Sequence, residues 1–337
     1  MAMPLVMLLF TGLVLMLFDG FGAKSVLPIV TAVGLITSIV LAIPGVGVQP
    51  GNKTLAFGQL IEFGGTYSLV HISMCAIGLF ALFFVSDYFK RVKTKVDEAY
   101  ALIVFAIIGM SLLACGNDLL VIFIGLETMS ICFYIMAALF KKDAGSTESG
   151  YKYFLLGAFA SGFLIYGVAL IYGLTGTTAL DAIRDAIFNA NPQASITNNL
   201  MFYPAIGLIL IGFLFKVAAF PFHTWTPDVY TGAPSPFAGF MATGGKIAAF
   251  VALAFFVFKA VPDTVFFSEL DPKAYNFIAF CAIASMIYGN VVAIQQRNIK
   301  RMLAYSSIAH SGYLLLGIIS GPEGYMAVIF YLLVYGL

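Results

Sequence analysis

Three charged residues interrupt apolar stretches that are long enough to cross a lipid bilayer. Lys216 lies within GLILIGFLFKVAAF, Lys246 within MATGGKIAAFVALAF, and Glu127 within LLVIFIGLETMSICFYIMAAL. A charge at the centre of a membrane helix costs about 2.5 to 3.5 kcal/mol on insertion scales, so it usually faces protein or water and serves transport. The three residues therefore indicate an ion or proton pathway. The competing interpretation is a structural ion pair, or lysines that reach the membrane surface.

A lysine serves a proton pathway only if its surroundings let it release its proton. The pKa of lysine is about 10.4 in water, and full burial can lower it by up to about 3 to 5 units. A neighbouring carboxylate opposes this effect because it favours the charged ammonium. Proton release from Lys216 would thus depend on how close Glu127 lies, and Lys246 would accept the proton through water.

The composition is that of a membrane protein. Hydrophobic residues make up 61% of the 337 residues and charged residues only 10%, against about 25% in soluble domains. The mean hydropathy is +0.99. Since a bilayer core of about 30 Å needs about 20 apolar residues in a helix, the apolar runs predict an all-α polytopic membrane protein with about eleven transmembrane helices. The runs are roughly 3–18, 26–44, 67–86, 99–115, 119–140, 153–174, 202–220, 235–258, 276–294, 302–320 and one from 324.

Basic residues between these runs predict the orientation of the chain. If the runs alternate in direction, one set of loops holds Lys24, Lys90, Arg91, Lys93, Lys95, Lys141, Lys142, Lys152, Arg297, Lys300 and Arg301. The opposite set holds Lys53, Arg184, Lys259 and Lys273. Loops rich in lysine and arginine stay on the cytoplasmic side. The N-terminus is therefore expected on the periplasm-like side.

The stretch PFHTWTPDVYTGAPSPF, residues 221–237, predicts a break after the seventh run. It contains four prolines, each of which lacks a backbone donor and disfavours a continuous helix. Broken backbone within a membrane is tolerated where protein or water satisfies the freed polar groups, and transporters place ion sites beside such breaks. The alternative is an ordinary loop that happens to contain prolines.

Four motifs together resemble one protein family. They are GLET in the fifth run, FKVAAFPFHTWTPDVYTGAP at the end of the seventh, GGKIA in the eighth and NIKRMLAYSSIAHSGYLLLG in the tenth. The combination resembles the antiporter-like subunit N family of proton-pumping NADH:quinone oxidoreductase, respiratory complex I, over most of residues 99–320. The motif WTPDVYTGAP resembles that of subunit N, whereas subunits L and M and the multisubunit cation/proton antiporters carry a WLPDA-like motif.

The resemblance implies a fold of about 14 helices, with two inverted five-helix repeats and a broken seventh helix. On this sequence, residues 1–98 would form the first three helices, 99–260 the first repeat (helices four to eight), and 276–337 an incomplete second repeat. The last run stops at Leu337 without a flanking charge or loop. A chain truncated at its C-terminus is therefore expected.

The resemblance also implies which residues carry protons. Glu127 would pair with Lys216, and Lys246 would continue a hydrated path along the middle of the membrane. Weaker candidates follow from position alone. His223 lies at the predicted break and His310 within the tenth run, and each serves packing equally well. Lys300 matches a family position, although a basic residue there more often lies at the interface.

The sequence offers no motif for a flavin, a nucleotide or an iron–sulfur cluster. Its four cysteines, Cys75, Cys115, Cys132 and Cys281, lack metal-binding spacing and are expected to pack as small apolar residues. The resemblance implies that NADH, FMN, iron–sulfur clusters and quinone bind partner subunits, so that this chain would serve the enzyme as a translocase subunit in an inner or plasma membrane. Expected partners are other membrane-arm subunits, including the adjacent antiporter-like subunit, and lipids. Nothing indicates nucleic acid.

Three interpretations remain at this point. The first is a proton-translocating subunit of NADH–quinone oxidoreductase, the second a subunit of a multisubunit sodium/proton antiporter, and the third a structural membrane scaffold. WTPDVYTGAP favours the first over the second. The three charges in separate apolar runs argue against the third. Protons are favoured over sodium because a buried lysine repels a metal cation and no acidic cluster surrounds it.

Overall fold

The computed structural model describes residues 2–49, 54–93, 96–188, 196–262, 266 and 273–336. Lys53 and Lys95, which contribute to the predicted orientation, lie outside these ranges. Within them the chain is almost wholly helical, apart from an antiparallel pair of short strands, β1 (Thr54–Ala56) and β2 (Ile61–Phe63). Nine described helices are long and apolar enough to cross a membrane, and the shorter apolar helices include Phe202–Lys216 and Glu323–Gly336. The predicted all-α membrane fold is confirmed.

Each predicted apolar run coincides with a helix. The first six are α1 (Met3–Gly20), α2 (Leu27–Val46), α3 (Thr66–Val92), α4 (Glu98–Cys115), α5 (Leu119–Ala137) and α6 (Ala144–Thr175). The later ones are α8 (Phe202–Lys216), the series α10 (Ser235–Phe240), η5 (Met241–Gly245), α11 (Lys246–Phe255) and η6 (Phe256–Ala260), then α13 (Lys273–Ile294), α14 (Ile299–Ile319) and α15 (Pro322–Gly336). Shorter elements are η1 (Lys24–Val26), α7 (Leu180–Phe188), η4 (Ile196–Asn198) and α9 (Thr226–Gly232).

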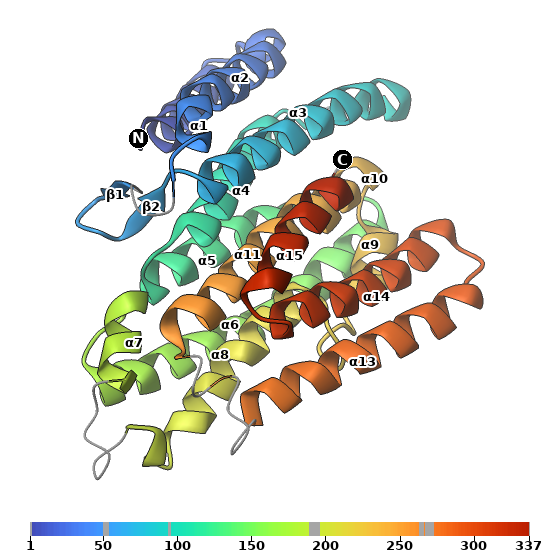
Figure 1. Ribbon diagram of the computed structural model, residues 1–337. Helices are drawn as coiled ribbons and strands as arrows, with labels where there is room; N and C mark the ends of the chain where they lie inside the picture. The colour runs from blue at the N-terminus through green and yellow to red at the C-terminus, as the bar shows by residue number, and fades with distance from the viewer. Residues whose placement is uncertain are drawn as a thin grey trace.

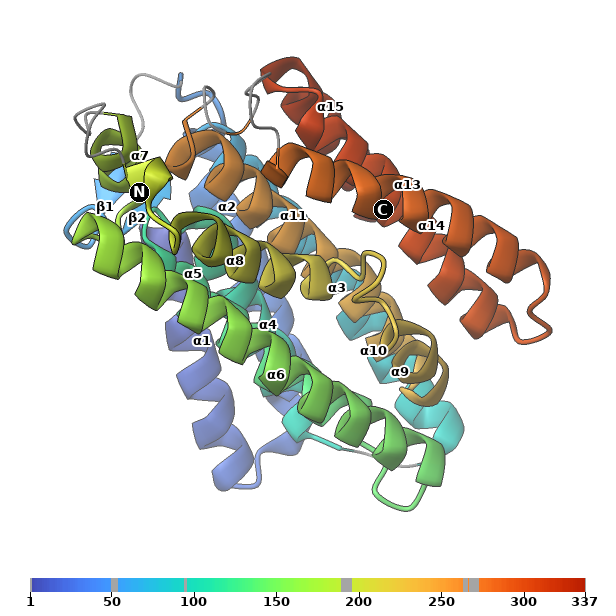
Figure 2. The ribbon, with the colours of Figure 1, turned by 90° about the horizontal axis from the view of Figure 1, so that it is seen from below.

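The helices form a bundle with α11 in its interior. Figure 1 shows α1 and α2 along one edge and α13 along the opposite edge, and Figure 2 shows the same separation from below. Every residue of α11 is buried, and this helix contacts α4, α8 and α15. A helix that is apolar all round belongs inside a bundle. The one charged residue of α11, Lys246, is therefore held within protein rather than against lipid.

Glycines let α4 and α5 pack at close range. A Cβ atom at Gly109 would lie 2.4 Å from the backbone nitrogen of Met129, and one at Gly125 would lie 2.4 Å from that of Leu113. Small residues allow membrane helices to approach until their backbones touch. This contact fixes α5, which carries Glu127 and Tyr134, against the N-terminal part of the bundle.

The predicted break lies between α8 and α9, and it begins earlier than expected. The seventh run was expected to continue to residue 220, but α8 ends at Lys216. Ala218 adopts a left-handed conformation with φ of 59°, which ends the helix before the first proline. The chain then forms α9 and turns into α10. Lys216 is thus the last residue of its helix rather than a residue within it.

Several helices extend beyond the predicted apolar runs into segments that were predicted to be loops. Several basic residues that were assigned to loops lie in helices, namely Lys90 and Arg91 in α3, Lys152 in α6, and Lys300 and Arg301 in α14. The helix α6 begins nine residues earlier than the predicted run at 153, where Asp143 accepts a hydrogen bond from the backbone nitrogen of Gly145. A helix continues past its apolar part until a capping residue ends it, so hydropathy alone places its ends too close together.

We expect Gly125→Ala to destabilise the protein because its new methyl group would collide with the backbone of α4. Overpacking of this kind costs about 1 to 3 kcal/mol. The matched control is Gly207→Ala in α8, where a Cβ atom meets nothing within 4 Å. Thermal unfolding in detergent should show a lower midpoint for the first variant and an equal or higher midpoint for the second. Equal midpoints for Gly125→Ala and the parent protein would contradict the close packing.

Candidate functional site

Lys216 is a buried ammonium at the end of α8. It is 6% exposed, and its Nζ atom donates no hydrogen bond to any described residue. Two aromatic rings lie close to it, with Nζ 5.3 Å from the ring centroid of Tyr134 and 5.1 Å from that of Tyr153. Ring faces attract a cation, but less strongly than water or a carboxylate would. Lys216 is therefore the least compensated charge of the site.

An aromatic cluster holds the end of α8 in place. Trp225 stacks on Tyr153 of α6, with ring centroids 4.4 Å apart and planes inclined by 7°. Its Nε1 atom donates a hydrogen bond of 3.1 Å to the carbonyl oxygen of Phe215. The same carbonyl oxygen accepts from the backbone nitrogen of Ala218 at 3.0 Å, so the indole is a second donor at the end of α8. The aromatic cluster of Tyr134, Tyr153 and Trp225 thus anchors the backbone beside Lys216.

Glu127 lies on α5 and is half-buried. Its carboxylate accepts a hydrogen bond from the hydroxyl group of Ser161, on α6. No ion pair between Glu127 and Lys216 is found among the described residues, although the carboxylate lies close enough to act electrostatically on the ammonium. The hydrogen bond that Glu127 accepts comes from the serine hydroxyl instead.

Lys246, in contrast, has defined partners. Its side chain is 2% exposed, and Nζ donates to the carbonyl oxygen of Ser307 at 2.6 Å and to Oγ of Ser311 at 2.7 Å, both on α14. Ser311 in turn donates to the carbonyl oxygen of Val217 at 2.5 Å. One hydroxyl group therefore connects Lys246 to the residue that follows Lys216.

Two π-helical turns flank α11. The turn η5 directly precedes Lys246 and contains Gly244 and Gly245, and η6 follows the helix. Such turns insert one extra residue into a helix and are frequent at functional sites. A Cβ atom at Gly245 would lie 2.7 Å from the ring of Phe133. The paired glycines thus permit a close approach of this turn to α4 and α5, since a Cβ atom at Gly244 would lie 2.9 Å from Sδ of Met110.

The remaining predicted residues lie around this centre. His310 is half-buried, and its Nδ1 atom hydrogen-bonds with the hydroxyl group of Tyr331. His223 is 5% exposed, and its ring packs 4.7 Å from that of Tyr288. Lys300 does not face the two buried lysines. Its Nζ atom donates to backbone carbonyl oxygens at residues 231 and 233, at 2.9 and 2.7 Å, so it holds the end of α9.

Three charged groups fasten α9 between two other helices. The carboxylate of Asp228 accepts from Lys152 of α6 at 2.8 Å and from Arg301 of α14 at 2.9 Å. All three side chains are partly exposed. Together with Lys300, these contacts fix the segment that carries the break against elements far apart in the sequence. These contacts therefore join α9 to both α6 and α14.

A cavity of about 440 Å³, lined by both apolar and polar side chains, lies beside the partners of Lys246. It extends between α10, η5 and α14. Its polar lining residues are Tyr230, Ser235, Thr243, Lys300, Ser306, Ser307, His310 and Tyr335. The hydroxyl group of Tyr335 donates to Oγ of Ser307 at 2.8 Å. The cavity therefore connects the region of Lys300 with the backbone that binds Lys246.

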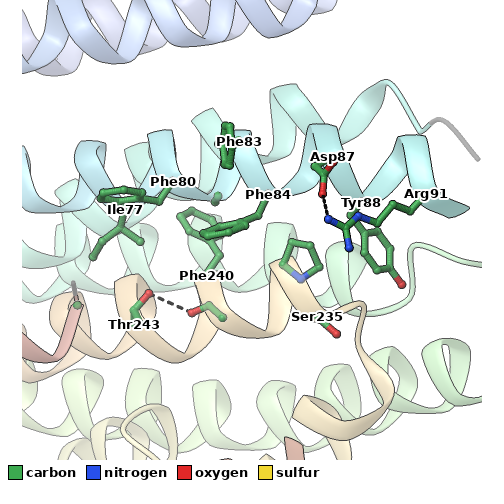
Figure 3. Close-up of a pocket in the computed structure, with 14 residues that line it drawn as sticks. Ile77, Phe80, Phe83, Phe84, Asp87, Tyr88, Arg91, Ser235, Phe240 and Thr243 are labelled. Carbon is green, nitrogen blue, oxygen red and sulfur yellow. Dashed lines mark hydrogen bonds and ion pairs between the residues drawn. The ribbon is translucent and has the colours of Figure 1, made fainter.

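A second, apolar groove lies away from the buried lysines. It has a volume of about 940 Å³ and separates α3 from α10 and η5 (Figure 3). Figure 3 shows Phe80, Phe83 and Phe84 on α3, with Asp87 paired to Arg91 toward one end. None of the predicted site residues lines it. This composition offers apolar contact rather than proton transfer.

Sequence reasoning missed four groups that contact the lysines. Tyr134 and Tyr153 lie against Lys216, and Ser307 and Ser311 bind Lys246. The aromatic cluster around Lys216 had one indication in the sequence. Trp225, which stacks on Tyr153, is the only tryptophan of the chain and lies within the proline-rich stretch. The two serines lie within the motif NIKRMLAYSSIAHSGYLLLG, but nothing in that motif indicated a contact with Lys246, which is distant along the chain. The four cysteines are buried and free.

Comparisons with known proteins agree on one family. The family model described as NADH:quinone oxidoreductase/Mrp antiporter, TM, matches residues 116–337. NADH-quinone oxidoreductase subunit N of Salinibacter ruber is 40% identical over 97% of this chain, which spans 62% of that relative. A chain of respiratory complex I from Thermus thermophilus has a TM-score of 0.80 at 33% identity, and the match covers 99% of this chain and 67% of that one.

A more distant structure shares the fold. A chain of the Mrp complex from a Dietzia species matches with a TM-score of 0.79 at 20% identity, over 99% of this chain and 62% of that one. The chain thus spans less than two thirds of the length of some of its relatives. Identity is much higher with the subunit N protein than with the Mrp chain.

We expect Asp228→Asn to loosen α9, because it removes the charge that binds both Lys152 and Arg301. Partly exposed pairs contribute up to about 1 kcal/mol each, so the loss should be about 1 to 2 kcal/mol. Asp87→Asn is the matched control, since Asp87 pairs with Arg91 on its own exposed helix surface. Thermal unfolding and protease cleavage after residue 216 provide the readouts. If the Asp228 variant were as stable and as protease-resistant as the control, Asp228 would not hold α9 between α6 and α14.

Proposed function

This chain belongs to the NADH:quinone oxidoreductase/Mrp antiporter family of membrane proteins, on its subunit N branch, and from that premise we propose that it translocates protons in the membrane arm of an NADH–quinone oxidoreductase. The relatives that support this assignment are named subunits of that enzyme. Lys216 and Lys246 would carry the proton, and Glu127 would control its release. Quinone reduction elsewhere in the complex would drive the transfer.

The unpartnered ammonium of Lys216 is the observation that carries the proposal. An isolated charge in a medium of low polarity is strongly unfavourable unless it is hydrated or loses its proton. Three further buried atoms without described hydrogen-bond partners lie on α5 and at the break, namely the hydroxyl oxygen of Tyr134, Oγ1 of Thr226 and Nδ1 of His223. Buried polar groups of this kind are usually satisfied by water. A hydrated break beside a lysine is what proton transfer requires.

Glu127 would act as the gate. In the structure its carboxylate binds Ser161, and Lys216 donates no hydrogen bond to it or to any other described residue. A movement of Glu127 toward Lys216 would stabilise the ammonium, and the return movement would favour proton release. Lys246 would receive the proton, and the polar residues that line the cavity along α14 would connect it with Lys300 and the adjacent surface.

The partners of the chain follow from the same proposal. The redox groups NADH, FMN, iron–sulfur clusters and quinone would bind other subunits, and this chain would perform no redox chemistry. Its neighbours would be other membrane-arm subunits, including an antiporter-like one, and lipids. Residues 99–260 would form the first five-helix repeat and residues from 276 part of the second. The basic loops would face the cytoplasm-like side and the N-terminus the periplasm-like side.

A sodium/proton antiporter is the less supported alternative. Similarity to the Mrp chain rests on 20% identity and shows a shared fold only. The ammonium of Lys246 is surrounded by two serine oxygens rather than by carboxylates. A lysine donates hydrogen bonds but offers no ligand to a metal cation. The geometry of the site therefore favours protons.

We expect Lys216→Met to abolish coupled proton pumping without preventing assembly. Methionine has a similar length but cannot bind a proton. The rates of proton pumping and quinone reduction should both fall by roughly a hundredfold, the lower end of what a positioned acid or base contributes. Both rates are measured in vesicles that contain the intact complex, after assembly has been confirmed on a native gel.

Lys142→Met is the matched control, because Lys142 is exposed after α5 and the same substitution there removes a charge outside the proposed path. Its pumping and quinone reduction should equal those of the parent complex. If an assembled Lys216→Met complex pumped protons at the parent rate, Lys216 would be a structural residue and the proposal would be wrong.

A further inference from the structure

Ser311 lies where the surroundings of the two buried lysines meet. It is fully buried on α14, and its Oγ atom accepts a hydrogen bond from Nζ of Lys246 at 2.7 Å. The same hydroxyl donates to the carbonyl oxygen of Val217 at 2.5 Å, with the carbonyl oxygen of Ser307 as a second acceptor at 3.0 Å. Three elements therefore meet at one side chain: α11, α14 and the first residue after α8.

The protonation state of Lys246 limits the directions that these hydrogen bonds can take. A lysine ammonium has three donors and no acceptor, so a charged Lys246 must donate to Ser311. The single hydroxyl hydrogen of Ser311 is then available to Val217. A neutral amine keeps two N–H donors and gains a lone pair, so Nζ can still donate to Ser307 while Ser311, after rotation of its hydroxyl group, donates to Nζ. The bond to Val217 is lost in that arrangement, which only the neutral amine permits.

The carbonyl group of Val217 depends on this bond. It follows the last residue of α8, where carbonyl groups have no partner within the helix. Val217 is fully buried, and an unsatisfied buried carbonyl group is unfavourable. The next residue, Ala218, holds a left-handed conformation that L residues rarely adopt. The backbone directly after Lys216 is therefore sensitive to the loss of one hydrogen bond.

We propose that Ser311 is a positioning residue that couples the protonation of Lys246 to the conformation of the backbone beside Lys216. When Lys246 is protonated, Ser311 binds the carbonyl group of Val217 and holds the backbone after Lys216 in place. When Lys246 loses its proton, this hydrogen bond can break and the backbone is free to move. The coupling is reciprocal, since a conformation that withdraws the Val217 carbonyl group makes the neutral state of Lys246 more favourable. The inference rests on the proposed function, because it assigns a further residue to the same proton path.

The test uses the intact complex in vesicles, with proton pumping and quinone reduction measured together. Ser311→Ala removes the hydroxyl group, and Ser311→Cys retains nearly the same volume but is a weak hydrogen-bond donor. We expect pumping to fall about tenfold in both variants, the loss that corresponds to one hydrogen bond to a charged group. Ser311→Thr keeps the hydroxyl group and should retain more than half of the parent rate.

Ser320→Ala, at the C-cap of the same helix, is the matched control. The hydroxyl group of Ser320 is exposed and donates to the carbonyl oxygen of Leu316 in the last turn of α14, so its removal should leave both rates unchanged. If Ser311→Ala does not assemble, the Cys variant carries the test. Parent-level pumping in the Cys variant, or a Thr variant as slow as the Cys variant, would overturn the proposal.

Lys216→Met, measured in the same vesicles, separates this inference from the proposed function. Loss of pumping in Lys216→Met together with normal pumping in both the Ala and the Cys variant of Ser311 would refute the role of Ser311 alone. Normal pumping in an assembled Lys216→Met complex would refute the proton path itself.

Discussion

The ammonium group of Lys216 is the constraint on which the rest of the site depends. It lies within a membrane bundle, is 6% exposed, and has no hydrogen-bond partner among the described residues. A charge in such surroundings requires water, a moving anion or the loss of its proton. The aromatic faces of Tyr134 and Tyr153 lessen the cost but do not supply a hydrogen bond. Small movements of the groups around Lys216 can therefore change its protonation state.

The helix break makes this placement possible. Lys216 closes α8 and Lys246 opens α11, so the two lysines lie on either side of the interrupted segment. Carbonyl groups freed by the interruption are bound by Trp225, Ser311 and Lys300. Side chains from α6 and α14 hold the segment between them. A continuous helix would offer neither free carbonyl groups nor space for water, so the break creates both the polar surroundings and the connection between the lysines.

Much of this architecture could be predicted from the sequence because its signals are local. Apolar runs located the membrane helices, the buried charges identified the candidate site, and the prolines indicated the break. The exact end of α8 could not be predicted, because it depends on the left-handed conformation of Ala218 and on partners distant in sequence. The same holds for Ser311, which lies 65 residues from Lys246.

The central claim is that Lys216 changes its protonation state during turnover. The most direct measurement is an infrared difference spectrum of the intact complex with ¹⁵N-labelled lysine, recorded at rest and during quinone reduction, with Lys216→Met to assign the band. The account predicts an ammonium band that changes intensity during turnover and is absent from the Lys216→Met spectrum. A Lys216 band of equal intensity in both states would contradict it, because a lysine that keeps its proton throughout turnover cannot carry protons across the membrane.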